Sequence, residues 1–484
     1  MILDAKGYRI SERHITTIIQ REGFARLFRR SKEIKRETLS NFNNKITAPK
    51  SEKLESAATE FSTSNAGLLC LLPYIQRYGI DQVIEKSDYP STSVIGKQSS
   101  IYCFIALKAS NVRRYSVDDI WCMDRGMGLF AGLNNLPKAG WFTSYADRVT
   151  RDMNISFLKE LNKIWKSNTL LSDTANLDFT TIPYWGDDSH FENNYSGKRG
   201  KGLASLLAVL AQDPDSGIIE YGDTNIRHNN EHDVVLEFLD FYRDGHKKDK
   251  SLRYLVFDSK FTNYQNLNRL NGDGIKFITI RSRGKNIIDK VNNTPTSQRK
   301  IIRVMCADGK GRTLKVVEER VTLNGYDKKI RQVAIIGGHG KVKPALIITN
   351  DFTIEIEALI RKYSRRWLVE KGICEQIEFF HLNRVTSSMV IKVDFDFTMS
   401  ILTHNIYRLL AKELEGYSHL SDISIFDKFI NNSGVVKLDQ NTINVGLKKK
   451  RNLPLLLTAL QKFQNVETAS WGNRKITFSG LSSS

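Results

Sequence analysis

The chain has 484 residues, of which 40% are hydrophobic and 26% charged, a balance typical of a globular protein long enough for several domains. Its 72 Lys and Arg against 53 Asp and Glu give a formal net charge of +19, which indicates an anionic partner and favours nucleic acid over a membrane surface. The longest apolar run is about half a membrane span, and no signal segment opens the sequence, so we expect no membrane partner and a cytoplasmic location. The five cysteines are scattered without a CxxC pair and favour neither a zinc site nor a disulfide framework.

The first part of the chain, residues 1–62, is predicted to be a basic helical DNA-binding arm followed by a linker. Residues 8–30 have the pattern of a helical hairpin, with Ser11 as a cap and Gly23 as a break. A helix–turn–helix and a generic pair of basic helices both fit this pattern. Residues 36–62 are rich in Ser, Asn and Lys, which favours a linker.

The hydrophobic pattern over residues 63–165 predicts a helical domain. After it, the spacing of hydrophobic residues changes to that typical of strands. Over residues 166–285 the predicted order is three strands, a helix, a strand, a helix and a strand. The second and third strands are joined by the turn sequence DPDSG at residues 213–217, which predicts a hairpin. This order is the ribonuclease H-like layout, an α/β fold whose mixed sheet carries helices on both faces.

Residues 286–349 contain four further strand-like runs separated by hairpin sequences, which predicts a β-rich insertion in the core. The second part of the core is expected at residues 350–415, and residues 416–484 form a C-terminal region.

Three acids fall at matching places in this layout. Asp178 lies in the first core strand, Asp258 ends the fourth, and Glu370 lies on the helix after the insertion. Strands one and four are neighbours in a ribonuclease H-like sheet, so the three carboxylates can meet at one point. Because clustered carboxylates repel one another, such a cluster implies divalent cations, and hard oxygen ligands suit two Mg²⁺ or Mn²⁺ ions. Two such ions can support phosphodiester cleavage or transfer.

Other acids compete for these roles. An Asp at a strand end, such as Asp258, is often only a cap. Asp178 is preferred over the neighbouring aspartates because it interrupts a strand. Glu370 is preferred over the other glutamates of its helix because it lies on the same side of the helix as Tyr363 and Arg366. The competing acids are Asp173, Asp187, Asp188, Glu375 and Glu378.

The helix predicted over residues 363–380 places Tyr363, Arg366 and Glu370 on one stripe. Taken alone, the stripe fits a solvated intrahelical Arg–Glu pair. If Glu370 binds metal, Arg366 and Tyr363 are instead expected to bind the DNA strand beside the scissile phosphate. Arg offers a fork to phosphate oxygens, and Tyr offers a hydroxyl or a ring for an unstacked base.

The segments LDFTTIPYWGDD, YLVFDSK and YSRRWLVEKGICEQIEFFHLNR resemble the three signature regions of DDE transposases of the insertion-sequence-four (IS-four) group. The resemblance covers roughly residues 60–415. It places the acidic triad of that family on Asp178, Asp258 and Glu370. Its signature Tyr–x2–Arg–x3–Glu–x6–Lys is met at Tyr363, Arg366 and Glu370, but Ile377 occupies the lysine position.

The resemblance implies metal-dependent cleavage at element ends and strand transfer into target DNA, as in cut-and-paste transposition. It also implies recognition of terminal inverted repeats, a homodimer in the synaptic complex, and a bacterial or archaeal cell as host. Two alternatives stay open, namely a ribonuclease H-like nuclease without joining activity and an inactive relative that only binds DNA.

Three further motifs have no assigned role. The loop SGKRGKG at residues 196–202 fits either a phosphate contact or a solvated loop. Asp394 and Asp396 come after the core and are expected to be structural. The run KKKR at residues 448–451 is expected to face solvent or DNA.

Overall fold

The computed structural model describes residues 59–481 except for residues 113–119, 186–190, 197–199, 247–250, 306–310, 337–343, 383–389, 464–466 and 469–472. The chain divides into two units, Met1–Ala57 and Ala58–Ser484, and the description below concerns the second. The basic arm expected within residues 1–62 therefore lies almost wholly outside the described residues. No described helix has the length and apolar composition needed to cross a membrane.

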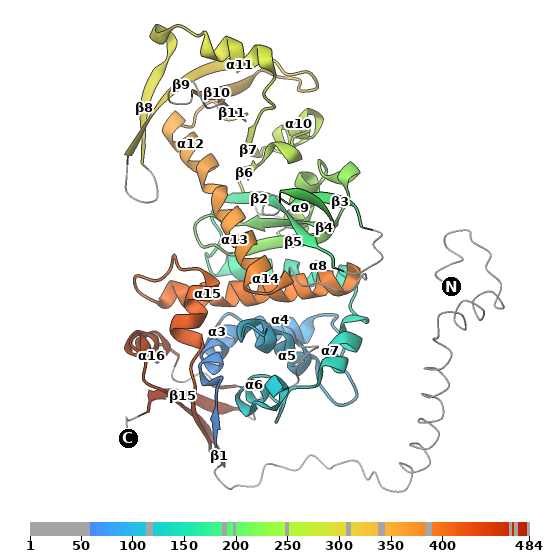
Figure 1. The fold of residues 1–484 in the computed structure, drawn as a ribbon, viewed down its shortest axis with the longest axis vertical. Coiled ribbons are helices and arrows are strands. Elements are labelled where there is room, and N and C mark those ends of the chain that lie inside the picture. The colour runs from blue at the N-terminus through green and yellow to red at the C-terminus, as the bar shows by residue number, and fades with distance from the viewer. Residues whose placement is uncertain are drawn as a thin grey trace, which may run out of the picture. The chain divides into compact units, whose positions relative to one another are not determined.

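The core is the predicted ribonuclease H-like sheet (Figure 1). In spatial order its strands are β5 (Ile219–Ile226), β4 (Lys201–Gln212), β2 (Thr174–Pro183), β6 (Tyr254–Phe257) and β7 (Lys276–Ile280). β4 is antiparallel to β2 and β5, whereas β2, β6 and β7 run parallel. A short strand, β3 (Asn193–Ser196), pairs with the start of β4.

Local sequence explains two features of this sheet. All four side chains of β6 are buried, as expected for a central parallel strand covered on both faces. The β4–β5 turn is organised by Asp213, whose Oδ1 accepts hydrogen bonds from the backbone N–H of Asp215 (2.9 Å) and Ser216 (2.7 Å). Gly217 closes this turn with a φ of 75°, a left-handed conformation that favours glycine.

Helices cover both faces of the sheet. They are α8 (Arg151–Ser167), α9 (Val234–Gly245), α10 (Tyr264–Gly272), α12 (Ile356–Arg365), α13 (Trp367–Glu378) and α14 (Val390–Glu413), with short turns η4 (His228–Asn230) and η5 (Ser259–Phe261). On β5, Tyr221 contacts Phe238 of α9, whereas Gly222 faces α14. A Cβ at Gly222 would lie 2.4 Å from the side chain of Ile401, so α14 packs this closely only because the residue is glycine.

The four strands predicted between residues 286 and 349 are present. They are β8 (Lys300–Met305), β9 (Gly311–Val321), β10 (Ile330–Ile336) and β11 (Ala345–Thr349), preceded by α11 (Lys285–Asn292) and η6 (Thr296–Gln298). β11 pairs with β7 and is followed outward by β10, β9 and β8. The strands of the insertion therefore continue the core sheet instead of forming a sheet of their own.

Helices predominate in the described residues before the core. They are η2 (Ala66–Leu71), α3 (Leu72–Arg77), α4 (Ile80–Lys86), α5 (Lys97–Ala109), η3 (Ile120–Met123), α6 (Arg125–Phe130) and α7 (Ala139–Ala146). α14 runs between the core sheet and these helices (Figure 1). Its buried side chains face both, so this long helix joins the two regions into one hydrophobic core.

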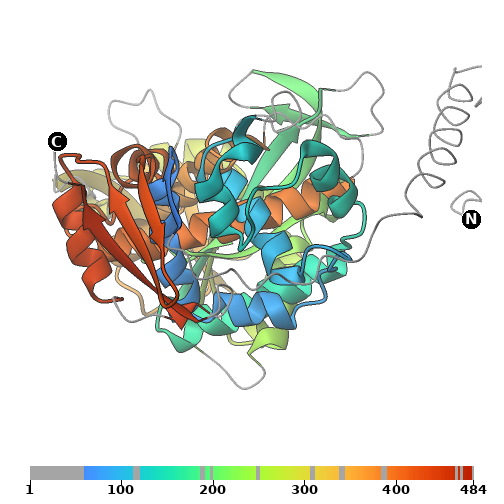
Figure 2. The same ribbon diagram turned by 90° about the horizontal axis from the view of Figure 1, so that it is seen from below.

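A second sheet is formed by both ends of the described chain. Its strands are β1 (Thr59–Thr63), β12 (Gly434–Leu438), β13 (Thr442–Leu447), β15 (Arg474–Gly480) and β14 (Glu467–Thr468), accompanied by α15 (Asp422–Ile425), η9 (Phe426–Ile430) and α16 (Leu453–Gln461). β1 pairs with β12 and lies beside the C-terminal strands (Figure 2). Residues 59–62, which were expected to lie in a linker, are therefore part of a strand. In this strand the side chains of Phe61 and Thr63 are buried and that of Ser62 between them is exposed, which is the alternation expected of a strand with one face on the core.

Candidate active site

Asp178 and Asp258 lie at the same level of the core sheet. β2 and β6 pair in parallel with Leu177 opposite Phe257. Asp178 is the next residue of β2, and Asp258 directly follows the end of β6. The Oδ1 of Asp178 accepts a hydrogen bond from the N–H of Phe179 at 2.8 Å. The Oδ1 of Asp258 accepts one from the N–H of Ser259 at 2.7 Å and caps η5. Both carboxylates are thus oriented by their own backbone.

The predicted helix over residues 363–380 is two helices, which corrects the sequence-based expectation. α12 ends at Arg365 and α13 begins at Trp367. Between them, the N–H of Arg366 donates to the carbonyl of Tyr363 at 3.1 Å, the tighter spacing of a 3₁₀ turn. The Asn176 amide of β2 donates to the Arg365 carbonyl at 3.2 Å. This contact from a distant strand fixes the helix junction above β2.

The helix junction brings Arg366 onto the first aspartate. Its Nη1 forms an ion pair with Oδ2 of Asp178, and the two side chains are only 13% and 12% exposed. A pair so shielded from water has a stronger Coulomb interaction than a surface pair, but both charges have lost hydration. Asp178 is therefore a partner of Arg366 on the sheet, and this arginine is shielded from solvent. Whether Arg366 also pairs with Glu370 depends on a side chain that lies outside the described residues.

Tyr363 lies close to the same charges. The guanidinium carbon of Arg366 is 5.8 Å from the centroid of the Tyr363 ring. Burial raises the pKa of the Tyr363 phenol to about 12; Arg366 lowers it, and the carboxylates of Asp258 and Asp178 raise it. The phenol is therefore neutral at physiological pH and can donate a hydrogen bond.

Glu370 lies on α13, which packs on β2, but its side chain is outside the described residues. The same holds for Glu375, whereas Glu378 is exposed. Among the rivals of Asp178, Asp187 and Asp188 are outside the described residues. Asp173 precedes β2 and is held by Lys362, whose Nζ lies 3.4 Å from its Oδ1.

The described donor set fits a hard divalent cation. Two carboxylates at adjacent strand positions offer the oxygen ligands that Mg²⁺ and Mn²⁺ bind, with water completing the coordination. Across the part of the chain that the structure describes, no group of three or more His, Cys, Asp or Glu side chains is placed to hold a metal ion. A third protein ligand would have to come from a side chain such as that of Glu370.

A comparison with protein families adds a further observation. Residues 173–406 match the family model described as Transposase DDE domain. This DDE-like region runs from the start of β2 into α14 and contains every candidate site residue. No curated protein matches the chain. Among solved structures, a piggyBac transposase synaptic complex with hairpin DNA has a TM-score of 0.37 and 10% identity, over 82% of this chain and 80% of that chain.

Within the DDE-like region, a set of contacts supports α12. Lys362 donates to Oγ1 of Thr174 at 2.6 Å, and its Nζ lies 4.4 Å from the centre of the Tyr254 ring. The Tyr254 hydroxyl donates in turn to Oδ2 of the buried Asp351 at 2.6 Å. Burial alone would raise the pKa of Asp351, but the hydrogen bonds from Tyr254 and Thr353 outweigh it and lower the pKa to about 2.

Two of these supporting residues were not found by sequence reasoning. Asn176 holds the helix junction, and Lys362 ties α12 to the start of β2. Asn176 could have been found from the sequence, because it lies two residues before Asp178 and alternate residues of a strand share one face of the sheet. Lys362 has no comparable local signal, since its partners lie far away in the sequence.

The other motifs have structural surroundings. Ile377 is half-buried and packs against the main core, so this position offers no cation. Asp394 is buried and accepts hydrogen bonds from Asn154 (2.7 Å) and Thr224 (3.0 Å). Asp396 forms an ion pair with Lys108 at 2.8 Å. The central residues of the loop SGKRGKG are outside the described residues, and the run KKKR follows β13 with Lys448 and Lys449 exposed.

Proposed function

We propose that the protein is a DNA transposase that cleaves DNA at element ends and joins the freed end to target DNA by cut-and-paste transposition. The observation that carries this proposal is the placement of Asp178 and Asp258 side by side in a region that matches the transposase DDE domain. Arg366 and Tyr363 lie against the same carboxylates. The resemblance to the IS-four group gives the finer assignment within this family.

In this proposal Asp178, Asp258 and Glu370 would hold two Mg²⁺ or Mn²⁺ ions, which would polarise the attacking and leaving oxygens of the phosphodiester. Asp178 and Asp258 supply ligand oxygens whose directions are set by backbone hydrogen bonds. Fixed directions matter because a preorganised site need not reorder itself during the reaction.

Arg366 and Tyr363 are proposed to bind the DNA strand beside the scissile phosphate. Guanidinium groups bind phosphate oxygens through two parallel N–H bonds. Arg366 is already held at the acidic site by Asp178, so it needs little reordering to contact a phosphate there. Tyr363 carries a neutral hydroxyl that donates a third hydrogen bond to the same strand.

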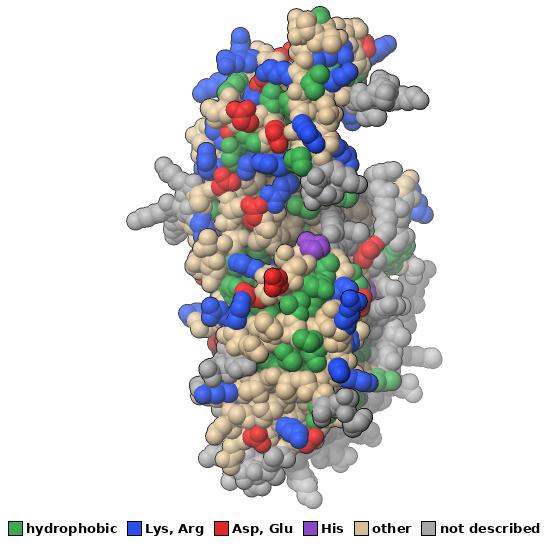
Figure 3. All heavy atoms as spheres, turned by 90° about the vertical axis from the view of Figure 1, so that its left-hand side faces the viewer, with side chains coloured by type: hydrophobic (Ala, Val, Ile, Leu, Met, Phe, Trp, Pro, Cys, Tyr) green, Lys and Arg blue, Asp and Glu red, His purple; other side chains and the backbone are tan. Residues whose placement is uncertain are grey.

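The proposed partners are double-stranded DNA, comprising terminal inverted repeats and target, and a second copy of the chain in the synaptic complex. The net charge of +19 supports a polyanionic partner. On the face shown in Figure 3, Lys and Arg side chains are spread along the whole surface and are interspersed with acids. A cytoplasmic protein of a bacterial or archaeal cell fits this assignment.

The test uses the full chain, Mg²⁺ and DNA carrying the imperfect inverted repeats that flank the coding sequence. One arm supplies an uncut end, and the second supplies a pre-cut end with a free 3′-hydroxyl together with target DNA. A transposase cleaves the first and forms a covalent joint in the second. Cleavage without joining would identify a nuclease, and binding without either reaction would identify an inactive relative.

A further inference from the structure

Asp178, one of the two aspartates of the candidate active site, is engaged on both of its carboxylate oxygens. Its Oδ1 accepts the N–H of Phe179 at 2.8 Å, and its Oδ2 pairs with Nη1 of Arg366. Because both charged side chains are largely buried, solvent screens their Coulomb interaction only weakly. A divalent ion that binds Asp178 therefore meets a guanidinium that already holds the same carboxylate.

Two cations at one carboxylate repel each other, and the repulsion grows with the charge of the incoming ion. Arg366 cannot lose its charge, because a guanidinium stays protonated in proteins. The repulsion falls only when the arginine side chain turns away from Asp178. While Arg366 remains there, the affinity of the site for Mg²⁺ or Mn²⁺ is lowered.

A phosphate oxygen of DNA is a suitable replacement partner for Arg366. Guanidinium groups bind phosphate and carboxylate alike through parallel N–H bonds. Tyr363 lies next to the arginine, with 5.8 Å between the guanidinium carbon and the ring centroid, and its neutral phenol can donate to the same phosphate. An arginine that moves from Asp178 to a phosphate leaves the carboxylate to the metal ion and keeps its own charge paired.

The backbone of Arg366 is held in place, so this exchange needs only a rotation of the side chain. Asn176 of β2 donates to the Arg365 carbonyl at 3.2 Å, and Nη2 of Arg365 donates to the Pro214 carbonyl at 2.6 Å. These contacts join the helix junction to β2 and to the β4–β5 turn. Neither contact involves Asp178, so both can persist when Arg366 releases it.

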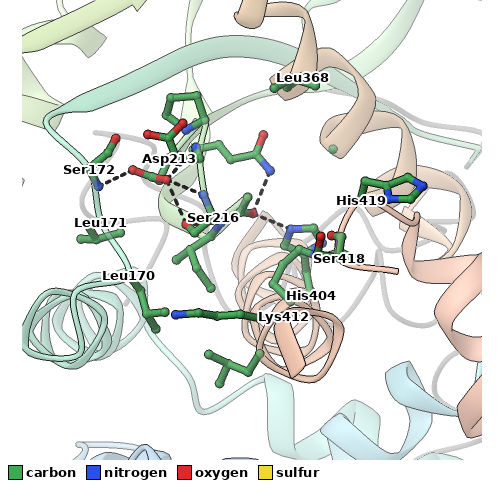
Figure 4. Close-up of a pocket in the computed structure, with 18 of the residues that line it drawn as sticks. Leu170, Leu171, Ser172, Asp213, Ser216, Leu368, His404, Lys412, Ser418 and His419 are labelled. Atoms are coloured by element: carbon green, nitrogen blue, oxygen red, sulfur yellow. Dashed lines mark hydrogen bonds between the residues drawn. The ribbon is translucent and has the colours of Figure 1, made fainter. Parts of the chain in front are cut away.

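On the other side of the junction, the first turns of α13 border an open cavity of about 660 Å³ (Figure 4). Leu368 and Gly372 belong to its wall, together with the β4–β5 turn and the second half of α14. A helix face that borders open space has fewer packing contacts than one that lies on a sheet. α13, which carries Glu370, can therefore adjust its position more readily than α12 when a metal ion binds.

We propose that Arg366 couples metal binding to DNA binding. Without DNA, Arg366 stays on Asp178 and keeps the affinity for divalent ions low. When DNA binds, Arg366 moves to a backbone phosphate and this affinity rises. The inference rests on the proposed function and adds a regulation of the same site: protein that is loaded with metal becomes abundant only on DNA. Because such a coupling is reciprocal, the metal ion also tightens DNA binding.

The test is titration of the full chain with Mn²⁺, followed by the electron paramagnetic resonance signal of unbound Mn²⁺. It is done without DNA and with a pre-cut element end whose 3′-hydroxyl is replaced by hydrogen, so that no joining occurs. DNA should tighten Mn²⁺ binding to the wild type about tenfold or more, within the usual range of coupling between sites. Without DNA, Arg366→Gln should bind Mn²⁺ about tenfold more tightly than the wild type, because it lacks the repelling charge. DNA should then add a smaller factor than in the wild type, whereas Arg366→Lys keeps the charge and should resemble the wild type without DNA.

Arg365→Gln is the matched control, because it removes the same charge from the neighbouring residue, which pairs with Asp215 at 2.6 Å. It should leave Mn²⁺ affinity unchanged. Thermal unfolding without metal checks the fold of each variant, and Arg366→Met, which keeps a long apolar stem, replaces Arg366→Gln if the latter does not fold. Equal Mn²⁺ affinity of the wild type and the uncharged variant without DNA would overturn the coupling and leave the metal site intact. Absence of Mn²⁺ binding in every protein, with and without DNA, would overturn the proposed metal site and the coupling with it.

Discussion

Two aspartates with arginine partners, Asp178 and Asp422, have opposite charge surroundings. Asp422, at the start of α15, is fully buried and faces two basic side chains, with His404 Nδ1 at 2.6 Å and Arg408 Nη2 at 3.0 Å. Asp178 pairs with Arg366, but a second carboxylate, Asp258, follows the end of the neighbouring strand at the same level.

The charge balance separates a structural cluster from a site suited to bind cations. His404 also contacts the carbonyl of Gly217 at 2.9 Å, so each of its ring nitrogens lies next to an oxygen atom. Burial would raise the pKa of Asp422, but His404 and Arg408 lower it below its ordinary value. One carboxylate is thus neutralised by the protein itself. Asp178 pairs with Arg366 but also has a second carboxylate, Asp258, close to it, and neighbouring carboxylates favour the binding of a cation.

The largest effect is expected from Asp258→Asn. This change keeps the shape of the side chain but removes one charge from the acidic pair, so DNA cleavage should fall more than about a thousandfold. Stability without metal should not decrease, because the substitution also removes like-charge repulsion. Thermal unfolding with and without Mg²⁺ gives a second readout: Mg²⁺ should raise the Tm of the wild type and not that of the variant. An active Asp258→Asn protein would remove this residue from the site.

Asp422→Asn should show the opposite pattern. Removing this charge leaves the Arg408 guanidinium buried without its charged partner, which is expected to lower the free energy of unfolding by about 3–5 kcal/mol. Urea unfolding measures this loss. DNA cleavage per folded molecule should stay within a few-fold of the wild type at a temperature where the variant is folded. A stable Asp422→Asn protein would break the distinction between the two clusters.

Arg366→Lys tests whether the arginine does more than neutralise Asp178. Lysine keeps the positive charge but loses the planar fork that binds phosphate, so strand joining should fall roughly tenfold to a hundredfold while stability changes little. Arg365→Lys is the matched control, because Arg365 contacts Pro214 and Asp215 instead of Asp178. Equal joining rates in the two variants would restrict Arg366 to a structural role.

The smallest effect is expected from Tyr254→Phe, which removes the hydroxyl that donates to Asp351. The free energy of unfolding should fall by about 1 kcal/mol near neutral pH. The Asp351 pKa is about 2 in the folded protein against an ordinary value of 3.8. The ionised carboxylate therefore adds to the free energy of unfolding above about pH 4, and this stabilisation is lost as the pH falls toward 2. The stability difference between variant and wild type should therefore shrink over that range. A difference independent of pH would assign the loss to packing.

The core was predictable because its strands are marked locally. β6 is a continuous apolar run, and the β4–β5 turn contains Asp213 and Gly217, whose chemistry defines the turn. The hydrophobic periods gave the order of elements, and that order was enough to predict that Asp178 and Asp258 lie on neighbouring strands.

What could not be predicted depends on contacts between distant residues. The break between α12 and α13 is tied to the Asn176 amide, which is 189 positions from the Arg365 carbonyl it contacts. The pairing of β11 with β7 likewise has no local signal, because any exposed strand edge would accept such a partner. The cavity between the β4–β5 turn, α13 and α14 arises from segments between residues 169 and 420 that meet only in the folded chain.

The pairing of β1 with β12 has a practical consequence for shortened versions of the protein. A fragment that begins after Thr63 keeps the C-terminal sheet but lacks β1, the strand that pairs with β12 at its edge. A fragment of residues 173–406 alone lacks this sheet altogether. In the fragment that begins after Thr63, the N–H and C=O groups of β12 that pair with β1 would be exposed and could pair with strands of other molecules, which favours aggregation. Expression trials should therefore retain β1, residues 59–63. A purification tag at the N-terminal end should be separated from this strand and not fused directly to it.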